Sequence, residues 1–517
     1  MALGLKPVFQ TSHTSFAVGF AVSLYAVCNV LNLGTLTKWF YRNDELDYAA
    51  LFAYLLAGLC LFIAFFSLVA HRRTVKAAAI ILTVLSAAVT YFVSKYDVAV
   101  DSSMIRNALH TDPTEVGQLL SLQMIPYVVF LAALPVLVIL SIEVTFEPTG
   151  RYLLASLKLV SLALCIAVGS LYLNYNAIHR AGNVSNKYIV YSLVPINVIS
   201  GGINAAWKAA KPWFTSHTHA ELRATVASPG DLVVVLAIGE SSRRRNFSLY
   251  GYSRKDTNPA LRRVDGLQLL DGIAKRGSTL DALPEILEKS GAKLPALVAA
   301  AGIPTACYVN YTLYDNCNGV GEAKATGCGH AGKCYDEDVI PMLRDNIESY
   351  STGQRLVVLH LGGGSHGPIY KDRYPPEFRR FLPMCDDADV ANQCSREQLY
   401  NSYDNSILYV DHVVNGILRT LDDSGAPYVF IYLSDHGESL MDGGRMFHGM
   451  PPGMDLPPEQ AQIPLIVRSS VPISIVRRAA YTQPDVYDTV LELLSVETPL
   501  FDTRGSFIRR ASSLAGG

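Results

Sequence analysis

The stretch Asp231–Ile238 (DLVVVLAI) decides the fold of the C-terminal half of this chain of 517 residues. Two later stretches share its run of consecutive apolar residues, Arg355–Leu361 (RLVVLHL) and Tyr428–Leu433 (YVFIYL). Strands without polar alternation are covered on both faces, as in a parallel sheet with helices on each side. Segments of helical period, Asp281–Lys289 and Ser406–Leu421, lie between these strands. The pattern therefore predicts a doubly wound α/β/α domain.

Polar residues follow each of the three predicted strands. Glu240 follows the first strand, His366 the second, and Asp435 with His436 the third. Because ligands bind at the carboxyl ends of the strands in open α/β sheets, we expect these side chains to meet at one edge. Two carboxylates and an imidazole suit zinc, so we interpret Glu240, Asp435 and His436 as metal ligands. One such strand end alone fits a helix cap or a salt bridge as well, but three in one domain favour a metal.

A candidate nucleophile lies between the first two strands, in Gly277–Pro284 (GSTLDALP). A metal-bound hydroxyl loses its proton far below its ordinary pKa, so a Ser or Thr can serve. The positive end of the helix predicted to follow favours a phosphate beside Ser278 or Thr279. The local sequence by itself favours a plainer role, in which one of these two residues caps the helix.

Five apolar runs occupy the N-terminal third of the chain. Each is close to the ~20 residues that cross the hydrocarbon core of a membrane. A buried core helix explains one such run but not five in succession, so we predict an all-α bundle of five transmembrane helices. The runs are Ser15–Leu33, Tyr48–Ala70, Ala77–Ser94, Met124–Ile142 and Tyr152–Leu173.

Lysines and arginines near the span ends set the expected orientation. Their modest excess on one side puts the N-terminus in the cytoplasm; this side has Lys6, Arg72, Arg73, Lys76, Arg151 and Lys158. Five spans then place everything after residue 175 outside. We expect a transmembrane domain at 1–175, a membrane-surface linker at 176–228 and an extracytoplasmic catalytic domain at 229–517. The net charge of -2 gives no indication of a nucleic-acid partner.

Six of the nine cysteines lie in the C-terminal half. An even set in an exported domain predicts up to three disulfides. The alternative, a zinc site, fits poorly because the spacings differ from those of CxxC zinc knuckles. We expect all six to be oxidised, with Cys385 paired to Cys394, and leave the pairing of the others open: Cys307, Cys317, Cys328 and Cys334.

Long motifs give the chain a resemblance to the membrane-bound phosphoethanolamine transferases of Gram-negative bacteria, the family of lipid A modifiers and mobile colistin-resistance enzymes. The resemblance runs over essentially the whole chain. The motifs follow in the family's order: Asn107–Glu115 (NALHTDPTE) in the membrane half, then Glu240–Arg254 (ESSRRRNFSLYGYSR), Ser365–Pro368 (SHGP), Tyr403–Tyr409 (YDNSILY), Ser434–Leu440 (SDHGESL) and His448–Pro451 (HGMP).

The resemblance implies a catalytic domain of the alkaline-phosphatase and sulfatase type with Zn²⁺ as cofactor. It matches Glu240, Asp435 and His436 to zinc ligands. At the nucleophile the chain departs from the lipid A enzymes, whose run there contains cysteines. The segment from Thr279 is instead similar to that of the lipoteichoic acid synthases, so we choose Thr279 over Ser278 as nucleophile and further metal ligand.

The remaining site residues also come from the resemblance. It matches His366 and His448 to histidines near the substrate phosphate or a second zinc. It matches Asn107, Thr111 and Glu115 to residues that contact the head group of the donor lipid.

The expected function is transfer of phosphoethanolamine from phosphatidylethanolamine to an envelope acceptor, through a covalent intermediate on Thr279. The acceptor is lipid A, the lipopolysaccharide core or another glycan or protein, and the location is the bacterial inner membrane with the catalytic domain in the periplasm. The departure at the nucleophile loop puts lipid A, and with it polymyxin resistance, in question. Two alternatives are a zinc-dependent hydrolase of the same superfamily, with water as acceptor, and a membrane sensor built on an inactive domain.

Overall fold

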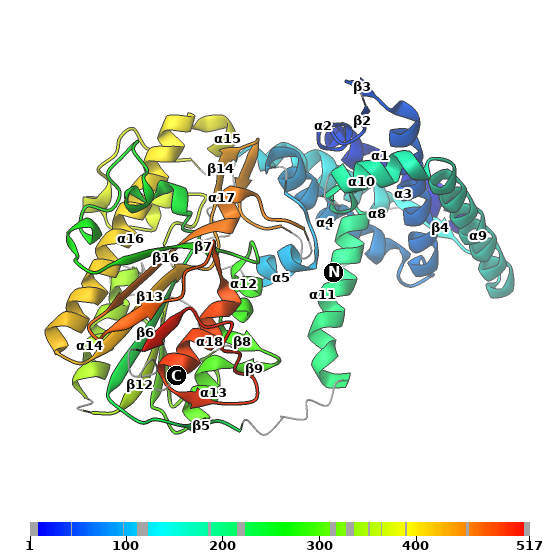
Figure 1. The fold of residues 1–517 in the computed structure, drawn as a ribbon. Coiled ribbons are helices and arrows are strands. Elements are labelled where there is room, and N and C mark those ends of the chain that lie inside the picture. The colour runs from blue at the N-terminus through cyan, green and yellow to red at the C-terminus, as the bar shows by residue number, and fades with distance from the viewer. Residues whose placement is uncertain are drawn as a thin grey trace. The chain divides into compact units, whose positions relative to one another are not determined.

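The computed structural model describes residues 9–42, 44–96, 98–110, 122–184, 188–214, 223–310, 317–326, 335–349, 352–362, 364–387, 390–450 and 454–510. The chain divides into two compact units (Figure 1). The first is built on Met1–Lys211 and the second on Pro212–Met450 and Leu456–Gly517.

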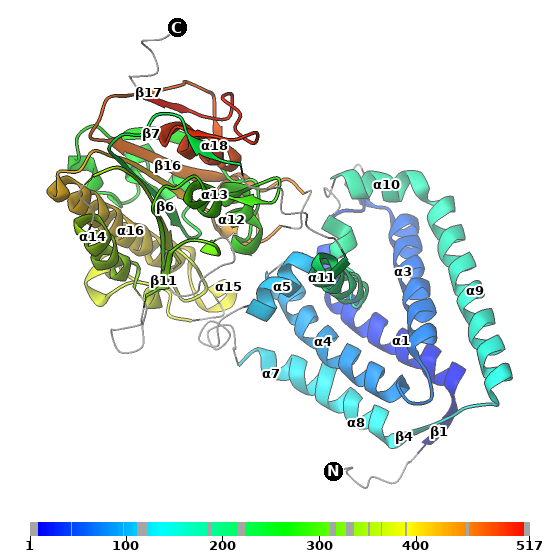
Figure 2. The same ribbon diagram turned by 90° about the horizontal axis from the view of Figure 1, so that it is seen from below.

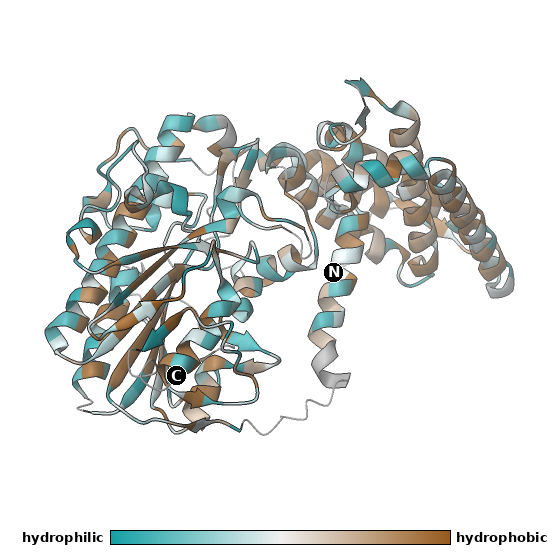
Figure 3. Ribbon diagram, viewed as in Figure 1, coloured by the Kyte–Doolittle hydropathy of each residue, from teal (hydrophilic) through white to brown (hydrophobic). Residues whose placement is uncertain are grey.

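Five helices of the first unit are long and apolar enough to cross a membrane, as the sequence predicts. Their most apolar windows have mean hydropathies of 1.7 to 2.5. At 1.5 Å per residue, a helix of about 20 residues spans the roughly 30 Å hydrocarbon core. Figure 3 colours these helices mostly brown, for hydrophobic residues. They are α1 (His13–Leu31), α3 (Tyr48–Val69), α4 (Val75–Tyr96), the composite helix Met124–Ser141 and α9 (Thr149–Leu173).

The composite helix has three parts, which Figure 2 shows as one continuous rod. An α-helical turn, α7 (Met124–Tyr127), is followed by a π-helical segment, η1 (Val128–Ala133), and by α8 (Leu134–Ser141). Pro135 lies at the start of α8 and has no N–H to donate to a carbonyl one turn earlier, which interrupts the α-helical pattern.

Shorter elements complete the first unit. The connection after the fifth span is helical over much of its described length. The elements are β1 (Phe9–Ser12), which pairs with β4 (Ile142–Thr145), α2 (Leu33–Thr37), β2 (Tyr41–Arg42), β3 (Glu45–Leu46), α5 (Ser102–His110), α10 (Tyr175–Val184), η2 (Tyr188–Tyr191) and α11 (Ile196–Phe214).

The second unit is built on an eight-stranded sheet. The strand β16 is antiparallel to both of its neighbours, and all other neighbouring pairs are parallel. In order across the sheet, the strands are β11 (Glu322–Ala325), β10 (Thr305–Val309), β12 (Gln354–Leu361), β6 (Leu232–Gly239), β13 (Tyr428–Ser434), β16 (Gln462–Ser469), β7 (Gln268–Ile273) and β18 (Tyr481–Thr482).

Helices cover both faces of this sheet, which confirms the predicted α/β/α layers (Figures 1 and 2). On one face, α12 (Thr279–Leu287), α13 (Leu294–Ala300) and α18 (Gln483–Leu493) share a core with alternate residues of β6 and β13. The other face is covered by α14 (Val339–Glu348) and α16 (Arg396–Ser424). Every residue of β6, β12 and β13 is buried, as runs without polar alternation require.

The register of the three central strands brings their carboxyl ends level. Gly239, the last residue of β6, lies opposite Leu361 at the end of β12 and Ser434 at the end of β13. Side chains that follow these residues therefore emerge at one edge of the sheet. A side chain at Gly239 would not fit, because a Cβ atom there would lie 2.5 Å from the hydroxyl of Tyr432.

Candidate active site

Glu240, Asp435 and His436 meet directly beyond the ends of β6 and β13. The backbone N–H of Asp435 donates to the carbonyl of Gly239, with a distance of 2.9 Å, which joins the two strand ends. His436 Nε2 lies 3.2 Å from Asp435 Oδ2 and 3.7 Å from Glu240 Oε1. All three side chains are buried. Such a group is rare in a protein interior unless a cation or hydrogen bonds offset the charges.

This group has the donor atoms that a divalent cation needs. The three residues each offer one ligand atom, and these atoms lie within 4.8 Å of one another. Within the part of the chain that the structure describes, Asp435 Oδ2 and His436 Nε2 are buried and have no hydrogen-bond partner. Buried polar atoms without a partner are costly, and both point to the same space. Two oxygens and an imidazole nitrogen in this arrangement fit a divalent metal such as zinc.

Thr279 lies beside this group at the start of α12. Its Oγ1 donates a hydrogen bond of 2.9 Å to Glu240 Oε2. The N-cap position of α12 belongs to Ser278, whose hydroxyl contacts Asp281 Oδ2 at 3.3 Å and caps no backbone N–H. The hydroxyl of Thr279 is thus directed to the carboxylate and not to the backbone of its own helix.

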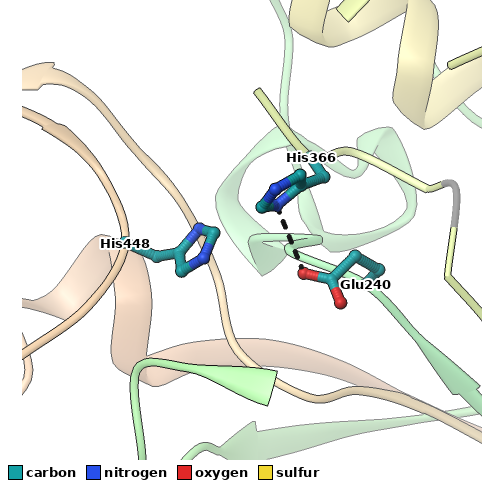
Figure 4. Close-up of side chains that lie close together, drawn as sticks. All are labelled: Glu240, His366 and His448. Atoms are coloured by element: carbon teal, nitrogen blue, oxygen red, sulfur yellow. Dashed lines mark ion pairs between the residues drawn. The ribbon is translucent and has the colours of Figure 1, made fainter. Parts of the chain in front are cut away.

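His366 and His448 approach Glu240 from two separate segments (Figure 4). His366 Nδ1 lies 3.6 Å from Glu240 Oε1. The rings of His366 and His448 are 4.9 Å apart, and the rings of His448 and His436 are 4.2 Å apart. The two histidines are more exposed than the metal-ligand candidates, with side-chain exposures of 17% and 14%. With Glu240 they form a second group that could hold a cation.

Two further residues support the site and were not singled out from the sequence. Ser241 adopts a left-handed backbone conformation (φ 55°). This conformation lets its Oγ donate to Glu240 Oε1 at 2.6 Å and its N–H donate to Asp435 Oδ1 at 3.0 Å. Glu438 is fully buried, and its Oε2 lies 2.9 Å from His448 Nδ1. Both lie within the quoted motifs, but Asp435 is 194 residues from Ser241 and His448 is 10 residues from Glu438, so no local pattern predicts these contacts.

The pKa values of the Asp435 and Glu240 carboxyls are shifted in opposite directions. Burial raises the pKa of Asp435 to about 7, and the nearby Glu240 carboxylate raises it further. Burial acts in the same direction on Glu240, but His366 and the neighbouring imidazoles hold the pKa of Glu240 well below its ordinary value. A cation among these ligands would favour the ionised form of both carboxyls.

Buried polar contacts hold the segment after β6 against α16. Asp404 of α16 accepts hydrogen bonds from Asn246 Nδ2 (2.7 Å), Tyr252 (2.9 Å) and Arg254 Nη1 (2.6 Å). One residue earlier, the hydroxyl of Tyr403 donates to the carbonyl of Ser241 at 2.7 Å. These contacts give a structural role to the first and third motifs of the catalytic half, since they fix the backbone beside Glu240.

The other candidate residues belong to the membrane half of the chain. Asn107 is in α5 of the first unit and is partly exposed. Thr111 and Glu115 lie outside the described residues.

The cysteines follow the expectation in part. The structure contains the Cys385–Cys394 disulfide. The expectation that all six outer cysteines are oxidised is wrong for Cys307 and Cys317, which are free and buried. Both lie in the core beside the sheet, where a thiol packs as a small apolar group. The other two, Cys328 and Cys334, are not among the described residues.

Comparisons with known proteins agree with this architecture. A family model described as phosphoethanolamine transferase EptA/EptB matches residues 58–209, and one described as sulfatase matches residues 290–496. The phosphoethanolamine transferase EptA of Salmonella typhimurium is 30% identical over 84% of this chain and 86% of that protein. EptA of Helicobacter pylori is 32% identical over 80% of each.

Two more relatives extend over nearly the full length. The phosphatidylethanolamine transferase Mcr-1 of Escherichia coli is 27% identical over 95% of this chain and 96% of its own length. The solved structure of the integral membrane lipooligosaccharide phosphoethanolamine transferase A of Neisseria meningitidis has the same fold. It superposes with a TM-score of 0.85 over 97% of this chain and all of that one, at 24% identity.

Proposed function

Since this chain belongs to the EptA family of phosphoethanolamine transferases, we propose that it moves phosphoethanolamine from phosphatidylethanolamine to an acceptor in the cell envelope, with Thr279 as nucleophile. The hydrogen bond from Thr279 Oγ1 to Glu240 carries this proposal. It gives the hydroxyl a proton acceptor at the sheet edge where the metal-ligand candidates converge, which is the arrangement of an activated nucleophile.

The first displacement forms the covalent intermediate on Thr279. The proton of Thr279 passes to water by way of Glu240 Oε2, whose low pKa keeps this carboxyl ionised between the steps, and Oγ1 forms a bond to the phosphorus of the donor. The bond from phosphorus to the diacylglycerol oxygen breaks, and that oxygen takes a proton from an imidazole of the His366–His448 pair. A phosphoethanolamine ester of Thr279 remains.

The second displacement transfers phosphoethanolamine from Thr279 to the acceptor. An acceptor oxygen attacks the phosphorus and its proton returns to the imidazole. The bond from phosphorus to Oγ1 breaks, and Thr279 regains a proton from water by way of Glu240. Charge on the phosphoryl oxygens is greatest during each displacement, and the proposed partners of those oxygens are the N–H groups of His366 and His448, whose rings lie 4.9 Å apart. Glu438 orients His448 by its contact with Nδ1, which leaves Nε2 free to face the substrate.

We assign a zinc ion to Glu240, Asp435 and His436, with Thr279 as the fourth ligand. When bound, such an ion supplies a lowered pKa for the nucleophilic hydroxyl and offsets the negative charge of the phosphoryl group. The partnerless atoms of Asp435 and His436 support this assignment.

The five apolar helices of the membrane unit support a lipid as the donor. A soluble phosphatase has no need of five membrane helices, whereas a lipid-consuming enzyme must meet its donor at the bilayer surface. We propose the bacterial inner membrane as its location, with the second unit in the periplasm. Although the nucleophile loop differs from that of the lipid A enzymes, lipid A is the proposed acceptor, because a relative in Salmonella typhimurium is a Kdo(2)-lipid A phosphoethanolamine 7''-transferase, 23% identical over 88% of this chain. The lipopolysaccharide core or another envelope glycan is the alternative.

The test is donor turnover by the full-length protein in lipid nanodiscs with fluorescent phosphatidylethanolamine. Thr279→Ala should lose nearly all release of fluorescent diacylglycerol, and Thr279→Ser should keep part of it. Ser278→Ala is the matched control, because the neighbouring hydroxyl caps no backbone N–H. Mass spectrometry should find phosphoethanolamine on the Thr279 peptide of the native enzyme. Normal turnover of Thr279→Ala would overturn the mechanism.

The same assay separates transfer from hydrolysis. With lipid A present, a transferase should attach phosphoethanolamine to lipid A. A hydrolase of the sulfatase type would release free phosphoethanolamine at the same rate with or without an acceptor.

A further inference from the structure

A pocket lined by both basic and apolar side chains lies at one end of the membrane helices. It has a volume of about 590 Å³ and is formed by the start of α4, the end of α8, and β4 with the residue that follows it. Arg72 and Lys76 contribute two cations, and the apolar lining includes Val144 and Phe146. A pocket of this composition suits a ligand that has an anionic part and an apolar part.

The course of the chain places this pocket at a membrane surface. Arg72 lies in the connection between α3, which ends at Val69, and α4, which begins at Val75. The strand β4 lies in the connection from the fourth span to the fifth. Because successive spans alternate in direction, both connections are on the side of the N-terminus, which the charge bias of the chain assigns to the cytoplasm. The molecules that can reach the pocket therefore include the head groups of the cytoplasmic leaflet.

The two cations are positioned by neighbours that carry no charge. The guanidinium of Arg72 lies 6.0 Å from the centre of the Phe146 ring. Lys76 Nζ donates to the carbonyl of Leu140 at 3.2 Å, which uses one of its three N–H groups. In the part of the chain that the structure describes, neither cation is paired with a carboxylate. Lys76 also lies in the first turn of α4, where the helix dipole favours an anion, so the pocket can bind a phosphate through both side chains.

A single carboxylate, that of Glu143, is among the residues that line the pocket. Its Oε2 accepts a hydrogen bond of 2.7 Å from Gln10 Nε2. Gln10 lies opposite Glu143 in the pairing of β1 with β4, so this contact is part of the pairing. Two cations and one carboxylate leave the pocket with a net positive charge. An anionic head group therefore gains more from this field than a zwitterionic head group, which has no net charge.

We propose that this pocket binds the head group of an anionic phospholipid of the cytoplasmic leaflet, with its phosphate at Arg72 and Lys76 and its glycerol against Val144 and Phe146. Basic pockets between membrane helices on this side recognise anionic head groups in this way. The site does not depend on the proposed function, whose donor is zwitterionic. A lipid held here contacts the α3–α4 connection and β4 together, so its binding stabilises the folded membrane unit.

The experiment titrates the full-length protein, freed of lipid in detergent, with phosphatidylglycerol or with phosphatidylethanolamine of the same acyl chains. Native mass spectrometry counts the bound lipids and gives an apparent affinity for each. The test variant carries Arg72→Gln and Lys76→Gln together. Arg73→Gln is the matched control, because Arg73 is an exposed arginine of the same connection but does not line the pocket. Arg72→Lys keeps the charge and reports whether the charge or the side-chain shape is recognised.

The native protein should bind phosphatidylglycerol more tightly than phosphatidylethanolamine. Each cation near a lipid surface contributes about fivefold in affinity, so the double variant should bind phosphatidylglycerol about 25-fold more weakly and lose the preference. Arg73→Gln and Arg72→Lys should both keep the preference. Equal binding of the two lipids by the native protein would overturn the site, and this comparison needs no variant to fold. Equal losses in Arg73→Gln and in the double variant would also overturn it, since they would indicate diffuse attraction to a basic surface.

A second titration distinguishes a lipid from a free phosphate. Glycerol phosphate has the charged part of the head group without the acyl chains, so at the same concentration it should not displace bound phosphatidylglycerol. Displacement would overturn the assignment of the pocket to a lipid. Neither titration measures the release of diacylglycerol, so failure of this site leaves the proposed function standing, and loss of turnover in Thr279→Ala leaves this site standing.

Discussion

The buried side chain of Arg243 allows a test of which contacts connect the segments that follow β6 and β13. Its side chain is fully buried directly behind Ser241 and Ser242. It pairs with Asp442 at 2.6 Å, donates to Asn246 Oδ1 at 2.5 Å and donates to the backbone carbonyl of Glu438 at 3.3 Å. The residue thus ties the segment after β6 to the segment after β13. We expect Arg243→Met, which keeps much of the side-chain volume, to remove this tie.

The expected loss of stability in Arg243→Met follows from the burial of its ion pair with Asp442. Removing one partner of a buried ion pair costs about 3–5 kcal/mol, because the other charge stays behind. Asp442 is 10% exposed and also lies 3.4 Å from Arg245, so the lower end, ~3 kcal/mol, applies. Arg245 is the matched control, since it contacts the same carboxylate but is 53% exposed. An exposed pair is worth at most ~1 kcal/mol, so Arg245→Met should change little.

Thermal unfolding of the full-length protein in detergent, followed by intrinsic fluorescence, measures the difference. At about 2–4 °C for each kcal/mol in a domain of this size, Arg243→Met should lower Tm by about 6–12 °C and Arg245→Met by no more than about 4 °C. Equal shifts for the two variants would refute the role given to the buried pair. A Tm that is unchanged in Arg243→Met would show that the two segments are held by other contacts.

Three further changes test other parts of the second unit. Glu438→Gln removes the charge that orients His448, so turnover should fall about 10- to 100-fold with little change in Tm, and full turnover would contradict this role. Replacing Cys385 and Cys394 together by serine opens a loop of sequence separation 9 and should cost at most ~3 kcal/mol of stability; no loss in protein from an oxidising compartment would contradict this. Burial raises the pKa of Asp411 to about 6. The protonated form therefore favours the fold, and this stabilisation is complete below about pH 4, the unfolded value, and lost as the pH rises through 6. Asp411→Asn should reduce the difference in Tm between pH 4 and pH 7, whereas an unchanged difference would show that other groups cause it.

The sequence predicted the architecture because the architecture depends on apolar runs. The predicted strand Asp231–Ile238 is observed as Leu232–Gly239, and the predicted span Tyr48–Ala70 is observed as Tyr48–Val69. Strands covered on both faces and helices surrounded by lipid must both be continuously apolar. The length of the apolar run distinguishes them, because a membrane helix needs a longer run than a strand. The sequence alone could therefore predict both units.

The role of Ser241 could not be predicted from the sequence, because its contact with Asp435 joins residues that are distant along the chain. Ser241 contacts Asp435, 194 residues away, and that contact depends on a left-handed backbone at Ser241. Nothing about a serine in a motif signals such a conformation, since it is uncommon for any residue other than glycine. The free thiols of Cys307 and Cys317 also depend on tertiary structure. An even cysteine count indicates that pairs can form, but packing in the core of the second unit determines which thiols stay buried and reduced.

Thr279 shows how the first residue of a helix can supply a reactive group. The local sequence favoured capping, because a Ser-Thr pair before a helix satisfies the first N–H groups of that helix. In the structure Ser278 takes the N-cap position, and Thr279 becomes the first residue of α12. A residue there needs no cap function, and its side chain points back past the helix start. That direction brings Oγ1 to Glu240, a residue delivered by a different part of the chain. The adjacent hydroxyls of Ser278 and Thr279 therefore differ in their surroundings more than in their chemistry, and this difference is what makes the paired substitutions at 278 and 279 informative.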